Sequence, residues 1–206
     1  KLAGAQVIST SDTWKSESTG IRMWSKKLVL RMIDRFTPGG KRQAIYLRDF
    51  GVPAKHIFPA NMTVDTKTMQ IFFAKYGDEH RRIIRHKLGI DDRGPVFLFV
   101  GRLEPVKGID LLLSAFGEVD SSVEARLVIV GDGTLRSKVE DAVERDTRIV
   151  FRGRLEDQAL WAQFAAADAL VAPSLTGPWG LVVNEALSSG LAIVVSDEFG
   201  CTDDLI

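Results

Sequence analysis

The sequence predicts an α/β protein built on a doubly wound parallel sheet, and two features of its second half carry that prediction. From about residue 95, runs of β-branched and aromatic residues alternate with segments of about ten residues at helical spacing. Each run is unbroken rather than alternately apolar and polar, which indicates strands buried on both faces. Such strands, joined by right-handed crossover helices, form a Rossmann-like domain.

The predicted elements follow one another in a regular order. The strands are 96–100, 125–130, 148–151, 169–173 and 192–196. The helices between them are 107–116, 135–144, 157–166 and one that begins at Gly180. Small residues follow four of the strands, at Gly101, Gly131, Gly153 and Ser174. Because parallel strands end at one edge of their sheet, where such sheets bind ligands, we expect the functional site at that edge.

The first 94 residues have a different organisation. The predicted elements are helices near 20–36, 41–50 and 67–88, a break at Pro38-Gly39-Gly40 and a connector at 57–65. We therefore expect a domain boundary near residue 60, with one domain over 1–60 and another over 61–206. The chain begins without Met and stops abruptly, so we also expect it to be a fragment of a longer protein.

The composition is that of an ordinary globular protein, with 45% hydrophobic and 26% charged residues. Cys201 is the only cysteine, which excludes an internal disulfide and suits a reducing compartment. No apolar run approaches the roughly 18 residues of a membrane-spanning helix, and the start lacks a secretory signal pattern. We expect a cytoplasmic protein without a nucleic-acid partner, and peripheral association with the inner face of the membrane stays open.

The net charge of zero hides an asymmetry along the chain. Residues 1–60 carry eleven Lys and Arg against four Asp and Glu, about +7, whereas the remainder carries sixteen against twenty-three, about −7. Within the basic part, apolar residues recur at helical spacing among lysines and arginines, at Ile21, Trp24, Leu28 and Met32. Two interpretations are open: a helix that lies on an anionic membrane, or a core helix with a solvated basic face, which we favour.

A helix start and two cations indicate that the site holds an anion. Pro178 and Gly180 break the chain before a predicted helix, whose first N–H groups can bind an anion. Glu185, about one and a half turns into that helix, can accept two hydrogen bonds from a diol such as a ribose. Arg102 and Lys107 flank the turn after the first strand of the sheet, so both side chains can reach one anion. Phosphate beside ribose indicates a nucleotide.

Other ways of binding a nucleotide fit the sequence poorly. No Asp-x-Asp pair occurs that would hold a divalent metal, so we expect no metal cofactor. The three histidines are scattered along the chain: His56, His80 and His86. The segment 101–108 lacks the Gly-Lys-Ser/Thr of a P-loop. Gly131-Asp132-Gly133 lacks the third glycine of a dinucleotide fingerprint, because position 136 is Arg. We interpret Gly133 as a tight turn and Gly131 as a backbone contact to the ligand.

Several short motifs together are more specific than any one of them. They are Phe-Val-Gly-Arg-Leu-x-Pro-x-Lys-Gly (99–108), Val-Gly-Asp-Gly (130–133), Phe-x-Gly (151–153), Ala-Asp-Ala (167–169), Pro-Ser-Leu-Thr (173–176), Trp-Gly-Leu-Val-Val-Asn-Glu-Ala (179–186) and Gly-Cys-x-x-Asp-Leu-Ile (200–206). In this order the chain resembles the donor-binding half of the group 1, family 4, retaining glycosyltransferases, which have the two-Rossmann-domain GT-B fold. The resemblance covers about residues 35–206 and is densest over 95–205.

The resemblance implies an activity and a division of the chain. The activity is transfer of a sugar from a UDP- or GDP-sugar to a glycan or lipid-linked acceptor, with retention of configuration and without a metal. Residues 1–60 would be the end of the acceptor domain and the start of the linker. Residues 61–206 would be the donor-binding domain, truncated at its C-terminus. A chain that lacks most of the acceptor domain should be inactive by itself.

The resemblance also implies roles for individual residues. Arg102 and Lys107 would be the catalytic residues that bind the diphosphate. Leu155 would contact the base through its backbone, and Glu185 would contact the ribose hydroxyls. The rest of the implied donor-binding set is Gly101, Gly131, Gly177, Trp179, Gly180 and Leu181, of which Gly180 and Leu181 meet the phosphate and sugar.

One position departs from the family pattern. The family has two glutamates eight residues apart, and Gly177 stands where the first, which contacts the donor sugar, is expected. Either Asn184 or a backbone group takes over that contact, or sugar handling is altered, or activity is reduced. Two rival functions therefore stay open: a sugar-nucleotide-binding module without transferase activity, and a nucleotide-sugar epimerase of the same fold.

Overall fold

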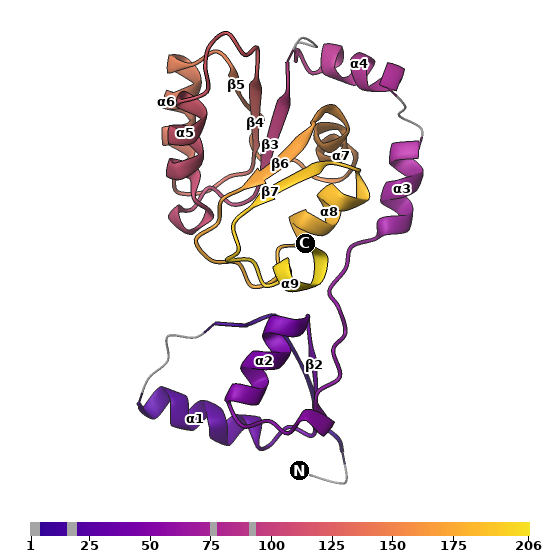
Figure 1. Cartoon of the computed structure of the whole chain (residues 1–206), viewed down its shortest axis with the longest axis vertical. Coiled ribbons are helices and arrows are strands. Elements are labelled where there is room, and N and C mark those ends of the chain that lie inside the picture. The colour runs from indigo at the N-terminus through magenta and orange to yellow at the C-terminus, as the bar shows by residue number, and fades with distance from the viewer. Residues whose placement is uncertain (1–4, 16–19, 75–77, 91–93) are drawn as a thin grey trace. The chain divides into compact units, whose positions relative to one another are not determined.

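The computed structural model describes residues 5–15, 20–74, 78–90 and 94–206 (Figure 1). By packing, the chain divides into two compact units. Unit 1 comprises Lys1–Thr63, Gly177–Leu181 and Glu198–Ile206, and unit 2 comprises Val64–Thr176 and Val182–Asp197. None of the described helices is long and apolar enough to cross a membrane.

Unit 2 is built on a five-stranded parallel sheet, as the sequence predicted. The strands are β3 (Val96–Val100), β4 (Arg126–Val130), β5 (Ile149–Phe151), β6 (Ala169–Ala172) and β7 (Ala192–Val195). Their order in the sheet is β5-β4-β3-β6-β7, and every neighbouring pair is parallel. The chain therefore builds outward from β3 in one direction and then returns to its other side, which is a doubly wound topology.

Helices cover both faces of this sheet. They are α3 (Thr66–Ala74), α4 (Asp78–Lys87), α5 (Ile109–Gly117), α6 (Arg136–Arg145), α7 (Asp157–Ala166) and α8 (Leu181–Ser188), with a short 3₁₀ turn η2 (Pro105–Lys107). In Figure 1, α5 and α6 lie on one face, and α7 and α8 lie on the other. Successive strand residues reach opposite layers: Leu98 packs into one apolar cluster with Phe164, and Phe99 into another with Leu112.

Helical structure precedes the sheet. A single helix was expected over 67–88, and the structure describes two helices in this range, α3 over Thr66–Ala74 and α4 over Asp78–Lys87. Residues 75–77, on which the continuity of the predicted helix depends, lie outside the described residues.

A carboxylate ties α4 to the amino edge of the sheet. Asp168, which directly precedes β6, accepts hydrogen bonds from the Val96 amide at 2.7 Å and from the Arg85 guanidinium at 2.7 Å. Arg81 donates to the other oxygen of Asp168 at 2.6 Å. Arg85 is itself buried and also donates to the Ala166 carbonyl at 2.8 Å. The Ala-Asp-Ala motif thus fixes a helix and the starts of two strands.

Unit 1 holds a second, smaller parallel sheet. It consists of β1 (Ile8–Ser11) and β2 (Arg35–Pro38), with α1 (Ile21–Leu30), α2 (Lys41–Asp49), the 3₁₀ turn η1 (Ala54–His56) and α9 (Thr202–Leu205). The helix predicted over 20–36 ends at Leu30, and its last residues belong to β2. That strand pairs with β1, which lies 27 positions earlier, so a local helical pattern did not reveal it.

The favoured interpretation of the first helix was also wrong. A core helix would bury its apolar stripe, but Ile21, Trp24 and Leu28 on α1 are 86%, 68% and 48% exposed, and Met32 just beyond it is 63% exposed. The apolar stripe of α1 faces away from the unit that it belongs to.

Removing the carboxylate of Asp168 should destabilise unit 2. In Asp168→Ala the buried Arg85 and the Val96 amide lose their acceptor, at a cost of about 1–3 kcal/mol in the free energy of unfolding. Chemical denaturation monitored by circular dichroism measures this cost. The matched control is Glu156→Ala, whose ion pair with Arg154 is exposed and should contribute less than about 0.5 kcal/mol. Equal effects of the two variants would contradict the role given to Asp168.

Candidate functional site

The carboxyl edge of the sheet, where the sequence predicts the site, includes the topological switch point of the fold. Strand order reverses between β3 and β6, because β4 and β5 extend to one side of β3 and β6 and β7 to the other. Gly101 and Gly131 directly follow β3 and β4, and Ser174 lies two residues after β6. Loops diverge at such a point and leave a crevice for a ligand.

The loops that follow β3 and β6 are pressed against each other. Gly108 has φ +70°, and a Cβ atom there would lie 2.0 Å from the carbonyl oxygen of Pro173. The Leu175 amide donates to the Val106 carbonyl at 2.9 Å. Only glycine allows both the left-handed conformation and the close approach at position 108. The turn that carries Arg102 and Lys107 is therefore held in one position.

The main chain after β4 comes equally close to the end of β3. Gly131 has φ +148°, and a Cβ atom there would lie 1.8 Å from the Gly101 carbonyl oxygen. The Gly131 amide donates to the Gly153 carbonyl at 2.8 Å, and the Gly101 amide donates to the Val130 carbonyl at 3.0 Å. The edge of the sheet is consequently lined by backbone rather than by side chains at these positions.

The two predicted cations share one electrostatic environment. Burial lowers the pKa of Lys107, and repulsion from the Arg102 guanidinium lowers this pKa further. Arg102 is exposed, whereas Lys107 is partly buried. Like charges on neighbouring groups disfavour each other, and a bound anion would offset that repulsion. The geometry thus suits a diphosphate at the end of β3.

Glu185 lies on the second turn of α8 and is partly buried. Burial raises the pKa of its carboxyl group. Within the described part of the chain, no hydrogen bond to this carboxylate is formed. A carboxylate of this kind gains from a ligand that donates hydrogen bonds to it. Leu155 behaves differently, because its side chain packs against the core of unit 2.

The other predicted site residues belong to unit 1. The Gly177 carbonyl accepts a hydrogen bond from the Trp14 indole at 2.8 Å, and the Pro178 carbonyl accepts one from the Gln43 amide at 2.7 Å. The ring of Trp179 is 2% exposed and lies so near Gly40 that a Cβ atom there would come within 2.4 Å. The Trp179 ring therefore supports this unit, and its assignment as a donor contact stays a prediction.

The ring of Phe199 occupies the space beside Gly177, the position that departs from the family pattern. A Cβ atom on Gly177 would lie 2.6 Å from Cδ1 of Phe199, and one on Gly180 would lie 2.4 Å from the same atom. Gly177 has no positive φ, so it is the ring rather than the backbone that excludes a side chain there. Sequence reasoning missed Phe199, as well as Trp14 and Gln43, because each acts through contacts with residues far away in the chain.

The residues that could ligate a metal were also located in the structure. Within the described ranges, no three His, Cys, Asp or Glu side chains gather in a way that would hold a metal ion. His56 lies in unit 1 and His86 is exposed on α4 of unit 2. The side chain of His80 lies outside the described residues.

Comparison with known families identifies the class of protein. The family described as glycosyl transferases group 1 matches residues 80–206, which is more than half of the chain. The chain belongs to this family. An uncharacterised glycosyltransferase of Methanocaldococcus jannaschii is 34% identical over 125 residues, which are 59% of this chain and 32% of the relative. A GDP-mannose-dependent phosphatidylinositol monomannoside mannosyltransferase of Corynebacterium glutamicum is 36% identical over 60% of this chain and 32% of its own length.

Solved structures agree on the fold. The Anabaena protein HepE in complex with UDP superposes with a TM-score of 0.80 at 18% identity, over 96% of this chain and 55% of that one. Sucrose-phosphate synthase from Thermosynechococcus elongatus gives 0.78 at 23% identity, over 100% and 53%. These similarities place the chain in the GT-B fold. The chain spans about a third of the length of the curated relatives it matches.

Adding a side chain at position 177 should destabilise unit 1. Gly177→Ala and Gly177→Glu both push against the buried Phe199 ring, at a cost of about 1–3 kcal/mol in the free energy of unfolding. A double-mutant cycle tests the cause: in a Phe199→Ala background, Gly177→Ala should cost close to nothing. The same cost in both backgrounds would mean that Phe199 is not what excludes a side chain at 177.

Neutralising Glu185 should stabilise the unliganded protein. Because burial raises the pKa of Glu185, its ionised form weakens the fold at neutral pH, and this loss disappears as the pH falls through the raised pKa. Glu185→Gln should therefore raise the midpoint of thermal unfolding at neutral pH, and the gain should shrink in acid. Glu118→Gln, at an exposed position directly after α5, is the control and should give no such gain. A gain that persists below the carboxyl pKa range would contradict this explanation.

Proposed function

We propose that this chain contributes the donor-binding part of a retaining glycosyltransferase that moves a sugar from a UDP- or GDP-sugar to a glycan or lipid-linked acceptor. One observation carries the proposal: two mutually repelling cations, Arg102 and Lys107, are fixed on one turn at the topological switch point. Membership of the group 1 family supports it. So do relatives that use GDP-mannose, and a similar structure that was solved with UDP-glucose.

The proposed chemistry is departure of a nucleoside diphosphate without a metal. Negative charge develops on the leaving diphosphate while the sugar passes through an oxocarbenium-like state. Arg102 and Lys107 stabilise that charge, and loss of one such contact costs about 2–4 kcal/mol of barrier. The role of the metal in other transferases is thus taken by fixed side-chain cations, with the α8 N-terminus as a weaker contributor.

Glu185 completes the nucleotide site in this proposal. Its partly buried carboxylate accepts hydrogen bonds from the ribose hydroxyls, and charged hydrogen bonds contribute about 1.5–3 kcal/mol each. Gly101 and Gly131 line the edge with backbone, so the diphosphate can approach the ends of the strands. Leu155 contributes the base contact through its main chain.

A second candidate function is binding of a sugar nucleotide without transfer. The observation that favours it is the ring of Phe199 beside Gly177, where the family has a carboxylate that meets the donor sugar. An apolar ring cannot accept hydrogen bonds from sugar hydroxyls. An epimerase of the same fold would use the same nucleotide site. Product analysis after incubation of the complete enzyme with a sugar nucleotide distinguishes transfer, epimerisation and binding alone.

The test of the nucleotide site is binding without metal. By calorimetry in EDTA, UDP or GDP should bind, and Arg102→Ala and Lys107→Ala should each weaken binding about ten- to a hundredfold, since charged hydrogen bonds are lost. Arg82→Ala, an exposed cation on α4, is the control and should leave the affinity unchanged. Binding only with Mg²⁺ or Mn²⁺, or equal affinities of all three variants, would refute the charge-neutralisation argument.

A further inference from the structure

A carboxylate lies in the middle of the turn that carries the two cations of the candidate site. Glu104 follows Arg102 by two positions and precedes Lys107 by three. By its charge alone, a carboxylate at this place opposes the binding of an anion to the same turn. Its contacts in the structure point to a different role.

The Glu104 carboxylate bonds to the loop that follows β4. Its Oε2 accepts a hydrogen bond from the Thr134 hydroxyl at 2.7 Å, and its Oε1 accepts one from the Thr134 amide at 3.2 Å. These two bonds, together with attraction to the Arg102 guanidinium, hold the pKa of Glu104 below its ordinary value. The side chain of Glu104 thus joins the loop after β3 to the loop after β4.

The main chain just before this carboxylate joins the same two loops. The Leu103 amide donates to the Asp132 carbonyl at 2.8 Å, and the Leu103 carbonyl accepts from the Leu135 amide at 2.8 Å. Leu103 is fully buried, and a Cβ atom on Gly133 would lie 2.6 Å from its carbonyl oxygen. The glycine contacts described above hold the two ends of the turn, and these bonds hold its middle.

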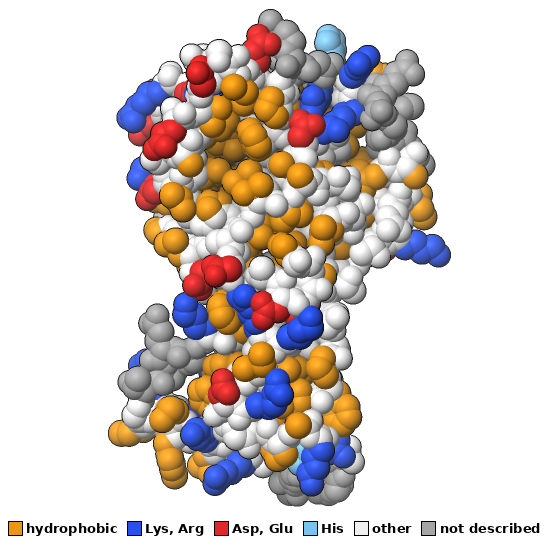
Figure 2. All heavy atoms as spheres, in the orientation of Figure 1, with side chains coloured by type: hydrophobic (Ala, Val, Ile, Leu, Met, Phe, Trp, Pro, Cys, Tyr) orange, Lys and Arg blue, Asp and Glu red, His pale blue; other side chains and the backbone are white. Residues whose placement is uncertain are grey.

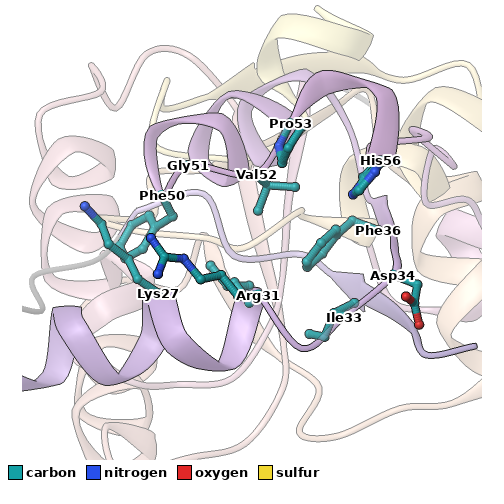
Figure 3. Close-up of a pocket in the computed structure, with 11 residues that line it drawn as sticks. Lys27, Arg31, Ile33, Asp34, Phe36, Phe50, Gly51, Val52, Pro53 and His56 are labelled. Atoms are coloured by element: carbon teal, nitrogen blue, oxygen red, sulfur yellow. The ribbon is translucent and has the colours of Figure 1, made fainter. Parts of the chain in front are cut away.

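A held turn matters because cations by themselves are common on this protein. Figure 2 shows lysine and arginine side chains at many places over both units. One further pair, Lys27 and Arg31, lines a cavity of about 520 Å³ in unit 1 (Figure 3). The cations that follow β3 differ in lying on a turn whose main chain is bonded to two neighbouring loops. Less conformational freedom is then lost when an anion binds.

We propose that Glu104 is a positioning residue for the nucleoside diphosphate. Its bonds to Thr134 hold the turn 101–108 in the conformation that directs Arg102 and Lys107 toward one anion. In the proposed function, on which this role rests, the carboxylate touches neither nucleotide nor sugar and acts through the two cations. Its charge and its hydrogen bonds then affect nucleotide binding with opposite signs, which makes the two effects separable.

Removal of the Thr134 hydroxyl tests the hydrogen bond without changing any charge. Thr134→Val should weaken the binding of UDP or GDP in EDTA about three- to tenfold, because the turn loses a bond that holds it. Thr134→Ser, which keeps the hydroxyl, should bind as the wild type does. The matched control is Thr147→Val, at an exposed position before β5 and at the opposite edge of the sheet. Calorimetry measures the affinities, and thermal unfolding checks that each variant is folded.

Glu104→Ala separates charge from position by the sign of its effect. If the carboxylate acted only through its charge, its removal would strengthen nucleotide binding, since a negative charge would leave the anion site. A positioning role predicts binding that is weaker by about three- to tenfold. The double variant with Thr134→Val should bind no more weakly than Glu104→Ala alone, because both changes remove the same contact. Glu144→Ala, an equal loss of charge at an exposed position of α6, should not change the affinity.

The matching nucleoside shows whether the effect passes through the two cations. Uridine and guanosine lack the diphosphate, so Thr134→Val and Glu104→Ala should lower the affinity for UDP or GDP and leave the nucleoside affinity unchanged. Arg31→Ala, which changes a cation of the unit 1 cavity, should alter neither affinity. An equal loss for both ligands would mean that the contact only supports the fold, and it would overturn the proposal.

The remaining outcomes separate this role from the nucleotide site itself. Tighter diphosphate binding by Glu104→Ala, or wild-type affinity in Thr134→Val, would refute the positioning role and leave the nucleotide site standing. Wild-type protein that binds neither UDP nor GDP would refute the nucleotide site, and the role of Glu104 with it.

Discussion

Close approach of main chain to main chain at the carboxyl edge of the large sheet is the constraint on which the candidate site depends. Cβ atoms at Gly108 and Gly131 would lie 2.0 Å and 1.8 Å from carbonyl oxygens of neighbouring loops, so no other residue fits at either position. Because Gly131 packs on Gly101 and Gly108 packs on Pro173, both ends of the turn 101–108, which carries Arg102 and Lys107, are held in place. Burial lowers the pKa of Lys107, and repulsion from the Arg102 guanidinium lowers this pKa further. In the proposed function a diphosphate offsets that repulsion, so a turn held by glycine contacts favours an anion.

Glycines also allow close packing in unit 1, but there a side chain fills the space. There the space made by Gly177 and Gly180 is filled by one aromatic ring, that of Phe199, rather than left for a ligand. Position 177 itself carries no side chain, and the adjacent Phe199 ring is an apolar wall that accepts no hydrogen bond. Gln43, fully buried, and Trp14 then hold the neighbouring carbonyls in place. Arg102, Lys107 and Glu185, the candidate nucleotide contacts, belong to unit 2, so recognition of the nucleotide and handling of the sugar are separate questions for this chain.

Local sequence patterns predicted the elements that interactions between neighbouring residues determine. The helix predicted over 157–166 has those bounds in the structure, and the glycines after β3 and β4 lie at the expected edge. Features set by distant contacts were missed. Strand β2 forms because it pairs with β1, and its first two residues, Arg35 and Phe36, were instead assigned to the helix before them. Helical periodicity found the stripe on α1, but periodicity cannot tell which side of a helix meets its own unit. That depends on Lys26 reaching the rings of Tyr46 and Phe50.

Three features of the chain are unfavourable by themselves and would become favourable with a suitable partner. The Glu185 carboxyl is partly buried and its pKa is raised, the Lys107 ammonium is partly buried and its pKa is lowered, and α1 exposes Trp24 to water. Without a ligand, each of these features lowers the stability of the fold. The Asp168 carboxylate, which pairs with the buried Arg85, lies instead at the amino edge of the sheet, away from the crevice. Such a division is expected when one edge of a sheet is specialised for binding and the other for stability. The positions where burial and charge conflict are therefore the best guide to where this protein meets its ligands.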